Sequence, residues 1–213
     1  MHTQSFDRLK KIISNFSGVK VLVIGDLILD EFLWGDVSRI SPEAPVPVVW
    51  VKKESFMPGG ASNVANNLRS LGAHTYLAGV IGDDERGAIL KGELEQKGID
   101  TSGIIADESR PTTLKTRVVA QHQQVVRIDK ERVDSLNDSL ISRIISHTKN
   151  IIDKIDAIII EDYGKGVITP KLLKYIVPLA RKHKKIVSVD PKEEHLEYSF
   201  LLKISLQPAY RRL

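Results

Sequence analysis

The sequence predicts an α/β fold, in which helices flank a mostly parallel β-sheet and a small antiparallel β-sheet is inserted. Three observations support this prediction: apolar runs, helical segments between these runs, and two strand-like stretches that no helix separates from their neighbours. A run that is apolar on both faces is typical of a buried strand in a parallel sheet. The runs lie at residues 19–24, 75–82, 156–162 and 185–191.

Helical segments separate these runs. They are expected near residues 60–71, 83–97, 137–152 and 170–184. Strands that alternate with helices at this spacing favour a parallel sheet joined by right-handed crossovers.

Two regions break this alternation. Residues 46–54 (VPVVWVKKE) have the composition of a strand, and residues 112–129 read as a hairpin that turns at QHQQ. We therefore expect the strands of an inserted sheet near 28–54 and 112–129. Such an insertion often forms a lid over a ligand or a dimer surface.

Composition excludes several classes of function. The 213 residues include no cysteine, so disulfides, thiolate metal sites and a cysteine nucleophile are excluded. The formal net charge is +4, but the basic residues are scattered apart from RKHKK at 181–185, which suits a helix C-terminus. No aromatic residues interleave with this cluster, so we expect no nucleic-acid partner.

The apolar runs are too short to span a membrane, and the N-terminus has no apolar core of a secretory signal. We therefore expect a cytoplasmic protein with no membrane partner.

Polar residues cluster where the apolar runs end. Ligands of open α/β sheets bind outside the carboxyl ends of the strands, so these residues are candidates for a site. Asp83 and Thr169 are good helix N-caps, and we assign them to that role. We assign the others to a binding site, namely Asp26, Asp30, Asp162 and Lys192.

The segment PGGASNVANN begins a predicted helix at Gly59-Gly60. Free backbone N–H groups and the positive end of the helix dipole face outward there, and glycines let a ligand approach closely. The amide of Asn63 can both donate to and accept from a sugar hydroxyl. The alternative is an ordinary glycine turn followed by an exposed helix.

Common nucleotide-binding motifs are absent. Residues 82–90 (GDDERGAIL) have the glycine spacing of a P-loop but continue with Ala88-Ile89 instead of Lys-Ser/Thr, and no G-x-G-x-x-G occurs. P-loop NTPases and Rossmann dehydrogenases are therefore poor interpretations.

Several segments in chain order carry a resemblance to a known family. They are GDLILDEFLWGDVSRISPEAPVPVV (25–49), PGGASNVANNLRSLGA (58–73), GVIGDDERG (79–87), DYGKGVIT (162–169) and DPK (190–192). Together they resemble the ribokinase-like (PfkB) carbohydrate kinases, and SRISPEAPVPVV is most similar to the heptose-7-phosphate kinases among them. The resemblance covers residues 5 to 192, and residues 193–213 keep no motif of the family.

The resemblance implies roles for individual residues. Asp26 and Asp30 would line the sugar pocket, and Gly59, Gly60 and Asn63 would contact sugar hydroxyls. Lys115 and Arg117 alternate onto one face of a lid strand, where they would bind the phosphate already on the sugar. The alternative for these two is an exposed strand face. The remaining candidates, Asp162, Lys165 and Lys192, would lie near the transferred phosphate and the nucleotide.

The implied reaction is phosphorylation of the anomeric hydroxyl of a heptose 7-phosphate by ATP with Mg²⁺, on the way to ADP-heptose and the lipopolysaccharide core. The family's catalytic base is an aspartate in a Gly-Ala-Gly-Asp segment. No such segment occurs in this sequence, so we name no catalytic residue and expect a chain that is incomplete at its C-terminus and inactive.

Two alternatives stay open. One is a non-catalytic fragment that binds a sugar phosphate or forms a homodimer through the lid strands. The other is a ribokinase-like kinase for a different sugar or nucleoside.

Overall fold

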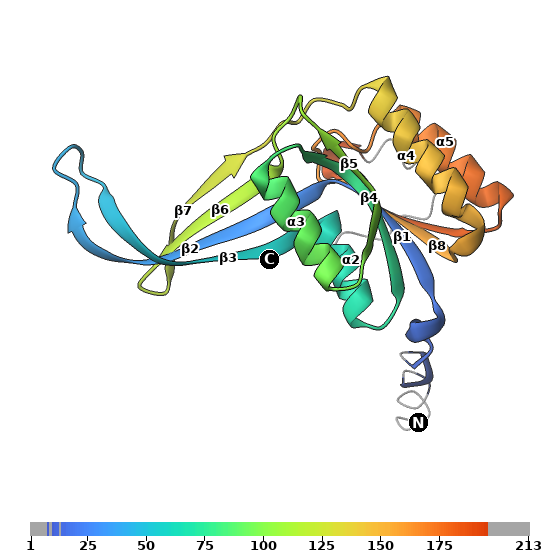
Figure 1. The fold of residues 1–213 in the computed structure, drawn as a ribbon, viewed down its shortest axis with the longest axis horizontal. Helices are drawn as coiled ribbons and strands as arrows, with labels where there is room; N and C mark the ends of the chain where they lie inside the picture. The colour runs from blue at the N-terminus through green and yellow to red at the C-terminus, as the bar shows by residue number, and fades with distance from the viewer. Residues whose placement is uncertain (1–7, 9, 13, 196–213) are drawn as a thin grey trace.

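The structure, a computed structural model, describes residues 8–195 apart from residues 9 and 13. Its centre is a five-stranded sheet in the order β5-β4-β1-β8-β9 (Figure 1), and all neighbouring strands run parallel. The strands are β1 (Lys20–Gly25), β4 (His74–Gly82), β5 (Asp100–Asp107), β8 (Ala157–Glu161) and β9 (Ile186–Asp190). The predicted α/β fold with a parallel sheet is confirmed.

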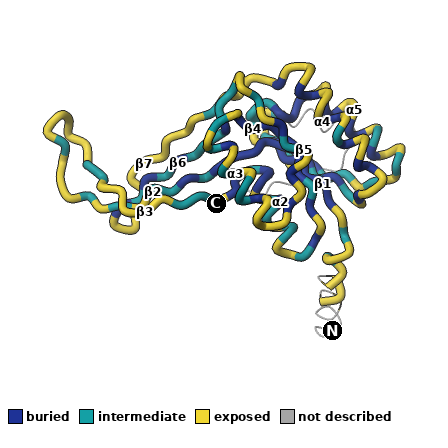
Figure 2. Tube along the Cα trace, viewed as in Figure 1, coloured by how far each residue is buried: buried dark blue, intermediate teal, exposed yellow. Residues whose placement is uncertain are grey.

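Helices cover both faces of this sheet (Figure 1), namely α2 (Ala61–Ser70) and α3 (Glu85–Gln96) on one face and α4 (Asp138–Ile151) and α5 (Pro170–Lys182) on the other. Strand β1 has an apolar sequence throughout because both of its faces are buried. Leu22 and Ile24 pack in the core under α4 and α5, whereas Val21 and Val23 pack in the core with α2. Figure 2 shows the resulting band of buried residues along the central strands.

Strand β5 was not predicted. It lies at the edge of the sheet and begins with Asp100, Thr101 and Ser102. Its burial alternates, because Thr101, Gly103 and Ile105 are buried while Asp100 and Ser102 are exposed. A strand of this kind lacks the continuous apolar run by which the other strands were found.

A second sheet extends away from the first (Figure 1) and has the order β3-β2-β6-β7. Its strands, which we call the lid, are β2 (Leu27–Ile40), β3 (Pro47–Gly60), β6 (Thr113–Ala120) and β7 (Gln123–Lys130). The β6–β7 hairpin turns at Gln121 and His122, both with positive φ, as QHQQ predicted.

The lid is a mixed sheet, not the antiparallel one that was expected. Strand β2 pairs antiparallel with β3, and β6 with β7, but β2 and β6 run parallel. They do so because both leave the carboxyl edge of the central sheet in the same direction, β2 directly after β1 and β6 after β5. Asp30 therefore lies within lid strand β2 and not at the end of a central strand.

The helix caps were predicted in part. Thr169 caps α5 as expected, since its side chain accepts from the backbone N–H of Leu172. The cap of α3 is Asp84 instead of Asp83, because the Asp84 side chain accepts from the backbone N–H of Gly87. Short 3₁₀ turns among the described residues include η1 (Phe16–Gly18), η2 (Ile152–Lys154) and η3 (Glu193–His195).

Residues 196–213, most of the segment expected to carry no family motif, lie outside the described residues. Within the described part of the chain, no helix is long and apolar enough to cross a membrane.

Candidate active site

Asp26 fixes a loop at the carboxyl edge of the central sheet. It follows β1 and is only 1% exposed. Its Oδ2 accepts hydrogen bonds from the backbone N–H groups of Tyr163 (2.8 Å) and Lys165 (3.0 Å), and its Oδ1 accepts from Val167 (3.1 Å). Burial raises the pKa of Asp26, and these backbone hydrogen bonds oppose the rise. The carboxylate is engaged with the loop, not presented to the space in front of the sheet.

The loop that Asp26 holds, residues 162–166 (DYGKG), needs both of its glycines. Gly164 and Gly166 have φ of 68° and 92°, a region that glycine adopts without strain. A Cβ on Gly164 would lie 2.6 Å from Cδ of Lys192, so the lysine side chain passes directly over the loop. Asp162 stabilises the turn, because its Oδ1 accepts from the backbone N–H of Gly164 at 2.9 Å and its Oδ2 lies 2.7 Å from Nδ1 of His195.

A cavity of about 420 Å³ opens beside this loop. Lys165 and Lys192 line it, together with Thr169 and Pro170 at the N-terminus of α5. Helix α5 has no acidic residue in its first turn, so its dipole adds positive potential to that of the two lysines. Glu131 and Glu194 also line the cavity and pair with these lysines, so an anion such as a phosphate group would compete with them for the cations.

A second polar cluster lies at the root of the lid. Asp30 on β2 forms an ion pair with Arg117 on β6, and both side chains are about one quarter exposed. Gly59 on β3 packs against them, since a Cβ there would lie 2.6 Å from Oδ2 of Asp30. The predicted sugar-pocket residues Asp30, Gly59 and Arg117 are thus brought together by three neighbouring lid strands.

Gly60 and Asn63 lie at the start of α2, beside this cluster. Gly60 is the N-cap of α2 with a φ of 54°, and a Cβ there would lie 2.6 Å from the backbone oxygen of Asp26. Asn63 is exposed in the first turn of the helix. At this helix start an exposed amide lies beside backbone that packs closely on Asp26, and contact with a sugar hydroxyl stays a prediction.

Lys115 connects the two clusters. Its ammonium lies 3.0 Å from Asp129 on β7 and 3.6 Å from Oε2 of Glu131, which follows β7. The other carboxylate oxygen of Glu131 accepts from Lys165 at 2.7 Å. Lys192 is paired with Glu194 at 2.7 Å, and that hydrogen bond is the main reason why the pKa of Lys192 is raised.

Glu161 and Asp190 bring two carboxylates together at the ends of neighbouring strands, where they are partners in the β8–β9 register. Glu161 is 6% exposed, and Asp190 is exposed. Burial, and to a lesser extent the charge of Asp190, raises the pKa of Glu161 to about 7. Among the described residues, no group of three or more acidic or histidine side chains is arranged to hold a metal ion.

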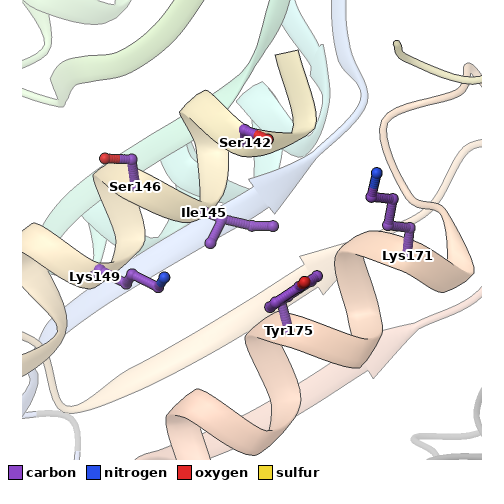
Figure 3. Close-up of a pocket in the computed structure, with 6 residues that line it drawn as sticks. All are labelled: Ser142, Ile145, Ser146, Lys149, Lys171 and Tyr175. Atoms are coloured by element: carbon purple, nitrogen blue, oxygen red, sulfur yellow. The ribbon is translucent and has the colours of Figure 1, made fainter. Parts of the chain in front are cut away.

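A separate cavity of about 310 Å³ lies between α4 and α5 (Figure 3). The residues that line it are Ser142, Ile145, Ser146, Lys149, Lys171 and Tyr175. None of them was predicted as a site residue. Lys171 already forms an ion pair with Asp138 at 2.6 Å.

Three residues of the site were not found from the sequence, namely Glu131, His195 and Arg110. Arg110 is a partly buried bridge that donates to the backbone oxygens of Lys165 (3.4 Å) and Asp134 (3.2 Å). All three act across long separations in the chain, so no local motif indicated them.

Comparisons with known proteins identify the family of the chain. The profile of the pfkB family carbohydrate kinases matches residues 19–206, and so runs past Lys192, the last residue of the motifs. The chain is 52% identical over 181 residues to the bifunctional protein HldE of Helicobacter pylori strain J99, and 46% identical over 180 residues to that of Desulfatibacillum aliphaticivorans. The matches cover 84% of this chain but only 39% and 37% of those proteins, so the chain spans well under half the length of these curated relatives.

Solved structures show the same fold at low identity. A possible 1-phosphofructokinase from Thermotoga maritima has a TM-score of 0.66 at 20% identity, covering 85% of this chain and 57% of that one. The tetrameric inhibited form of phosphofructokinase-2 from Escherichia coli has a TM-score of 0.63 at 17% identity, covering 86% and 58%. The fold and the profile match lead to one conclusion: the chain belongs to the pfkB family of carbohydrate kinases.

Proposed function

We propose that this chain carries the sugar-binding side and part of the nucleotide-binding side of a heptose-7-phosphate kinase. The reaction is transfer of the γ-phosphate of ATP to the anomeric hydroxyl of a heptose 7-phosphate, which yields a 1,7-bisphosphate. One observation carries the proposal. Two pairs of cationic side chains lie on either side of Glu131, namely Lys115 with Arg117 at the root of the lid and Lys165 with Lys192 beside the 162–166 loop. A reaction in which both substrates carry phosphate requires two such cationic regions.

On the sugar side, Asp30 accepts a hydrogen bond from a sugar hydroxyl, and the backbone at Gly59-Gly60 allows the sugar to lie close. Asn63 contacts a second hydroxyl. Lys115 and Arg117 bind the phosphate already on the sugar, since their cationic groups lie on the same face of β6. Asp26 acts from behind the site by holding the 162–166 loop.

On the nucleotide side, Lys165, Lys192 and the N-terminus of α5 fit the phosphate groups of ATP. Asp162 shapes the loop that presents Lys165. Mg²⁺ is bound by one or two carboxylates when phosphate oxygens and water complete its shell. Exposed Asp190 is the carboxylate at this edge that suits that role, and the metal would neutralise charge on the transferred phosphate.

The lid also offers a surface for a second copy of the chain. Trp50, Val126 and Ile128 are 66%, 46% and 55% exposed on its outer strands. Apolar side chains in such positions favour burial in an interface. We propose a homodimer through the lid strands of a cytoplasmic kinase domain that includes residues 1–192.

Binding and transfer should be measured separately. Calorimetry with heptose 7-phosphate tests binding, and release of ADP from ATP with Mg²⁺ tests transfer. Arg117→Gln should weaken sugar-phosphate binding by at least about tenfold, because a charge-assisted hydrogen bond contributes about 1.5–3 kcal/mol. Arg143→Gln is the matched control, since Arg143 is an exposed arginine on helix α4, outside the lid.

The outcomes separate the alternatives. Binding without ADP release would favour the non-catalytic fragment, and sedimentation would then test the lid dimer. Turnover of ribose or a nucleoside, but not of heptose phosphate, would favour another ribokinase-like kinase. An Arg117→Gln variant that binds as tightly as the wild type would contradict the proposed role of Arg117.

A further inference from the structure

Glu131 is an acidic residue among the lysines that the proposed function assigns to phosphates. Its Oε1 lies 2.7 Å from Nζ of Lys165 on the loop, and its Oε2 lies 3.6 Å from Nζ of Lys115 on the lid. Its charge also contributes to the raised pKa of Lys192, after the effect of Glu194. One carboxylate thus lies among three ammonium groups from three separate parts of the fold.

Glu131 also lines the cavity beside α5, so it occupies space that an anionic ligand would enter. Its side chain is 22% exposed, and those of Lys165 and Lys115 are 16% and 19% exposed. Partly buried cations interact strongly with any nearby anion. A phosphate group in the cavity and the carboxylate of Glu131 therefore compete for the same donors.

The present arrangement leaves Glu131 incompletely satisfied. Its Oε2 is buried and accepts no hydrogen bond from the described residues, because Lys115 is too distant for one and donates to Asp129 instead. A buried acceptor without a donor is unfavourable. Moving Glu131 into solvent would relieve that deficit once a ligand neutralises Lys165.

Glu131 also begins the linker between the lid and α4, residues 131–137. This linker packs on the 162–166 loop, since the backbone N–H of Leu136 donates to the oxygen of Gly166 at 3.0 Å. A Cβ on Gly166 would lie 2.1 Å from the oxygen of Asp134. The Lys165–Glu131 pair ties the lid end of the linker to the loop, and Arg110 bridges the two further along the linker at Asp134.

We propose that Glu131 is an internal anion that holds the lid to the phosphate loop, and that a phosphate group entering the cavity displaces it and releases the linker. The inference rests on the proposed function in one respect, that an anion enters this cavity. It adds a mechanism by which an anion bound on the nucleotide side changes how firmly the lid is held, and the proposed function places the sugar at the lid.

The first test is the affinity for inorganic pyrophosphate, measured by calorimetry at constant ionic strength. Glu131→Gln should bind pyrophosphate about fivefold to tenfold more tightly than the wild type, because the ligand no longer competes with a carboxylate. Asp134→Asn is the matched control. It removes one negative charge from the same linker, but Asp134 pairs with Arg132 and is 65% exposed, so its affinity should equal that of the wild type.

The second test follows the linker and the lid directly. Hydrogen exchange of the linker amides and of β7 should become faster when pyrophosphate binds to the wild type. In Glu131→Gln the exchange should be fast with and without pyrophosphate.

Equal or weaker pyrophosphate binding by Glu131→Gln would overturn the inference and leave the proposed function standing. So would slower exchange of the linker in the wild type on binding. Absence of pyrophosphate binding in both proteins would overturn the inference together with the nucleotide side of the proposed function, whereas the Arg117 experiment would still report on the sugar side.

Discussion

The central sheet and the lid are both β-sheets, but different forces hold them. Strand β1 buries every residue after Lys20, whereas strand β7 exposes all of its residues. The central sheet is therefore stabilised by apolar burial on both faces. The lid depends on strand pairing and on ion pairs, each of which contributes little when exposed.

Strand β2 passes from the buried central part of the molecule into the exposed lid. Its burial declines along the chain, from Leu27, Ile28 and Leu29 in the core to exposed residues near Ile40. At its root, Glu31 is 4% exposed and is held by Thr116 and by Arg86 of α3 at 2.7 Å. The lid is thus fixed where it meets the central sheet and adjustable further out. The proposed sugar-binding residues lie at this boundary, where rigidity and access to solvent meet.

The largest expected effect comes from breaking the anchor on the rigid side. Asp26→Ala removes the acceptor of three hydrogen bonds from backbone N–H groups, of which one is buried and two are partly buried. Each unsatisfied buried donor costs about 1–3 kcal/mol, so the free energy of unfolding should fall by about 4 kcal/mol. Urea denaturation followed by circular dichroism measures this change.

Asp83→Ala is the control for Asp26. Asp83 also follows a central strand, but it is exposed, and only its backbone N–H has a described hydrogen bond. Its replacement should change stability by less than about 0.5 kcal/mol. Similar losses in the two variants would show that Asp26 is not an anchor.

A smaller effect is expected from Glu161, at the same edge. Its pKa is about 7 in the folded state against an ordinary value of 4.5, so the folded protein binds this proton more tightly than the unfolded chain does. The stabilisation from protonated Glu161 is complete below pH 4.5 and is lost as the pH rises to 7. Glu161→Gln should therefore unfold like the wild type at pH 4.5 and be more stable by up to about 3 kcal/mol at pH 8.

Urea denaturation at a series of pH values tests this prediction. Asp190 supplies part of the effect, so Asp190→Asn should reduce the dependence on pH without abolishing it. A stability difference between Glu161→Gln and the wild type that is constant from pH 4.5 to 8 would contradict the raised pKa.

The central sheet could be predicted from sequence because burial on both faces of a strand requires a continuous run of apolar residues. Strands β1, β4, β8 and β9 carry the apolar runs that burial requires. Edge strand β5 was missed, since only one of its faces is buried. The lid strands were found by composition, but the parallel pairing of β2 and β6 depends on where both strands leave the central sheet.

The candidate site was less accessible to sequence reasoning. Asp162, Lys165 and Lys192 lie around one cavity or its loop, as the motifs indicated. The contacts of Glu131 and of Arg110 with Lys165 span 34 and 55 residues, respectively. No periodicity or motif encodes such contacts, because they arise only when the lid linker packs on the loop.

The smallest effect on stability is expected when the two partners of Arg86, one buried and one exposed, are replaced in turn. Arg86 lies 2.7 Å from Glu31, whose side chain is 5% exposed, and 3.1 Å from Glu54, whose side chain is 42% exposed. Glu31→Gln should lower the free energy of unfolding by about 2 kcal/mol, because it removes the buried charge that pairs with Arg86 and weakens the hydrogen bond that Glu31 accepts from Thr116. Glu54→Gln should change it by less than about 0.5 kcal/mol, since solvent screens the pair and Glu54 also repels Glu31. Urea denaturation of both variants measures the difference, and equal losses would mean that the root of the lid is no more rigid than its surface.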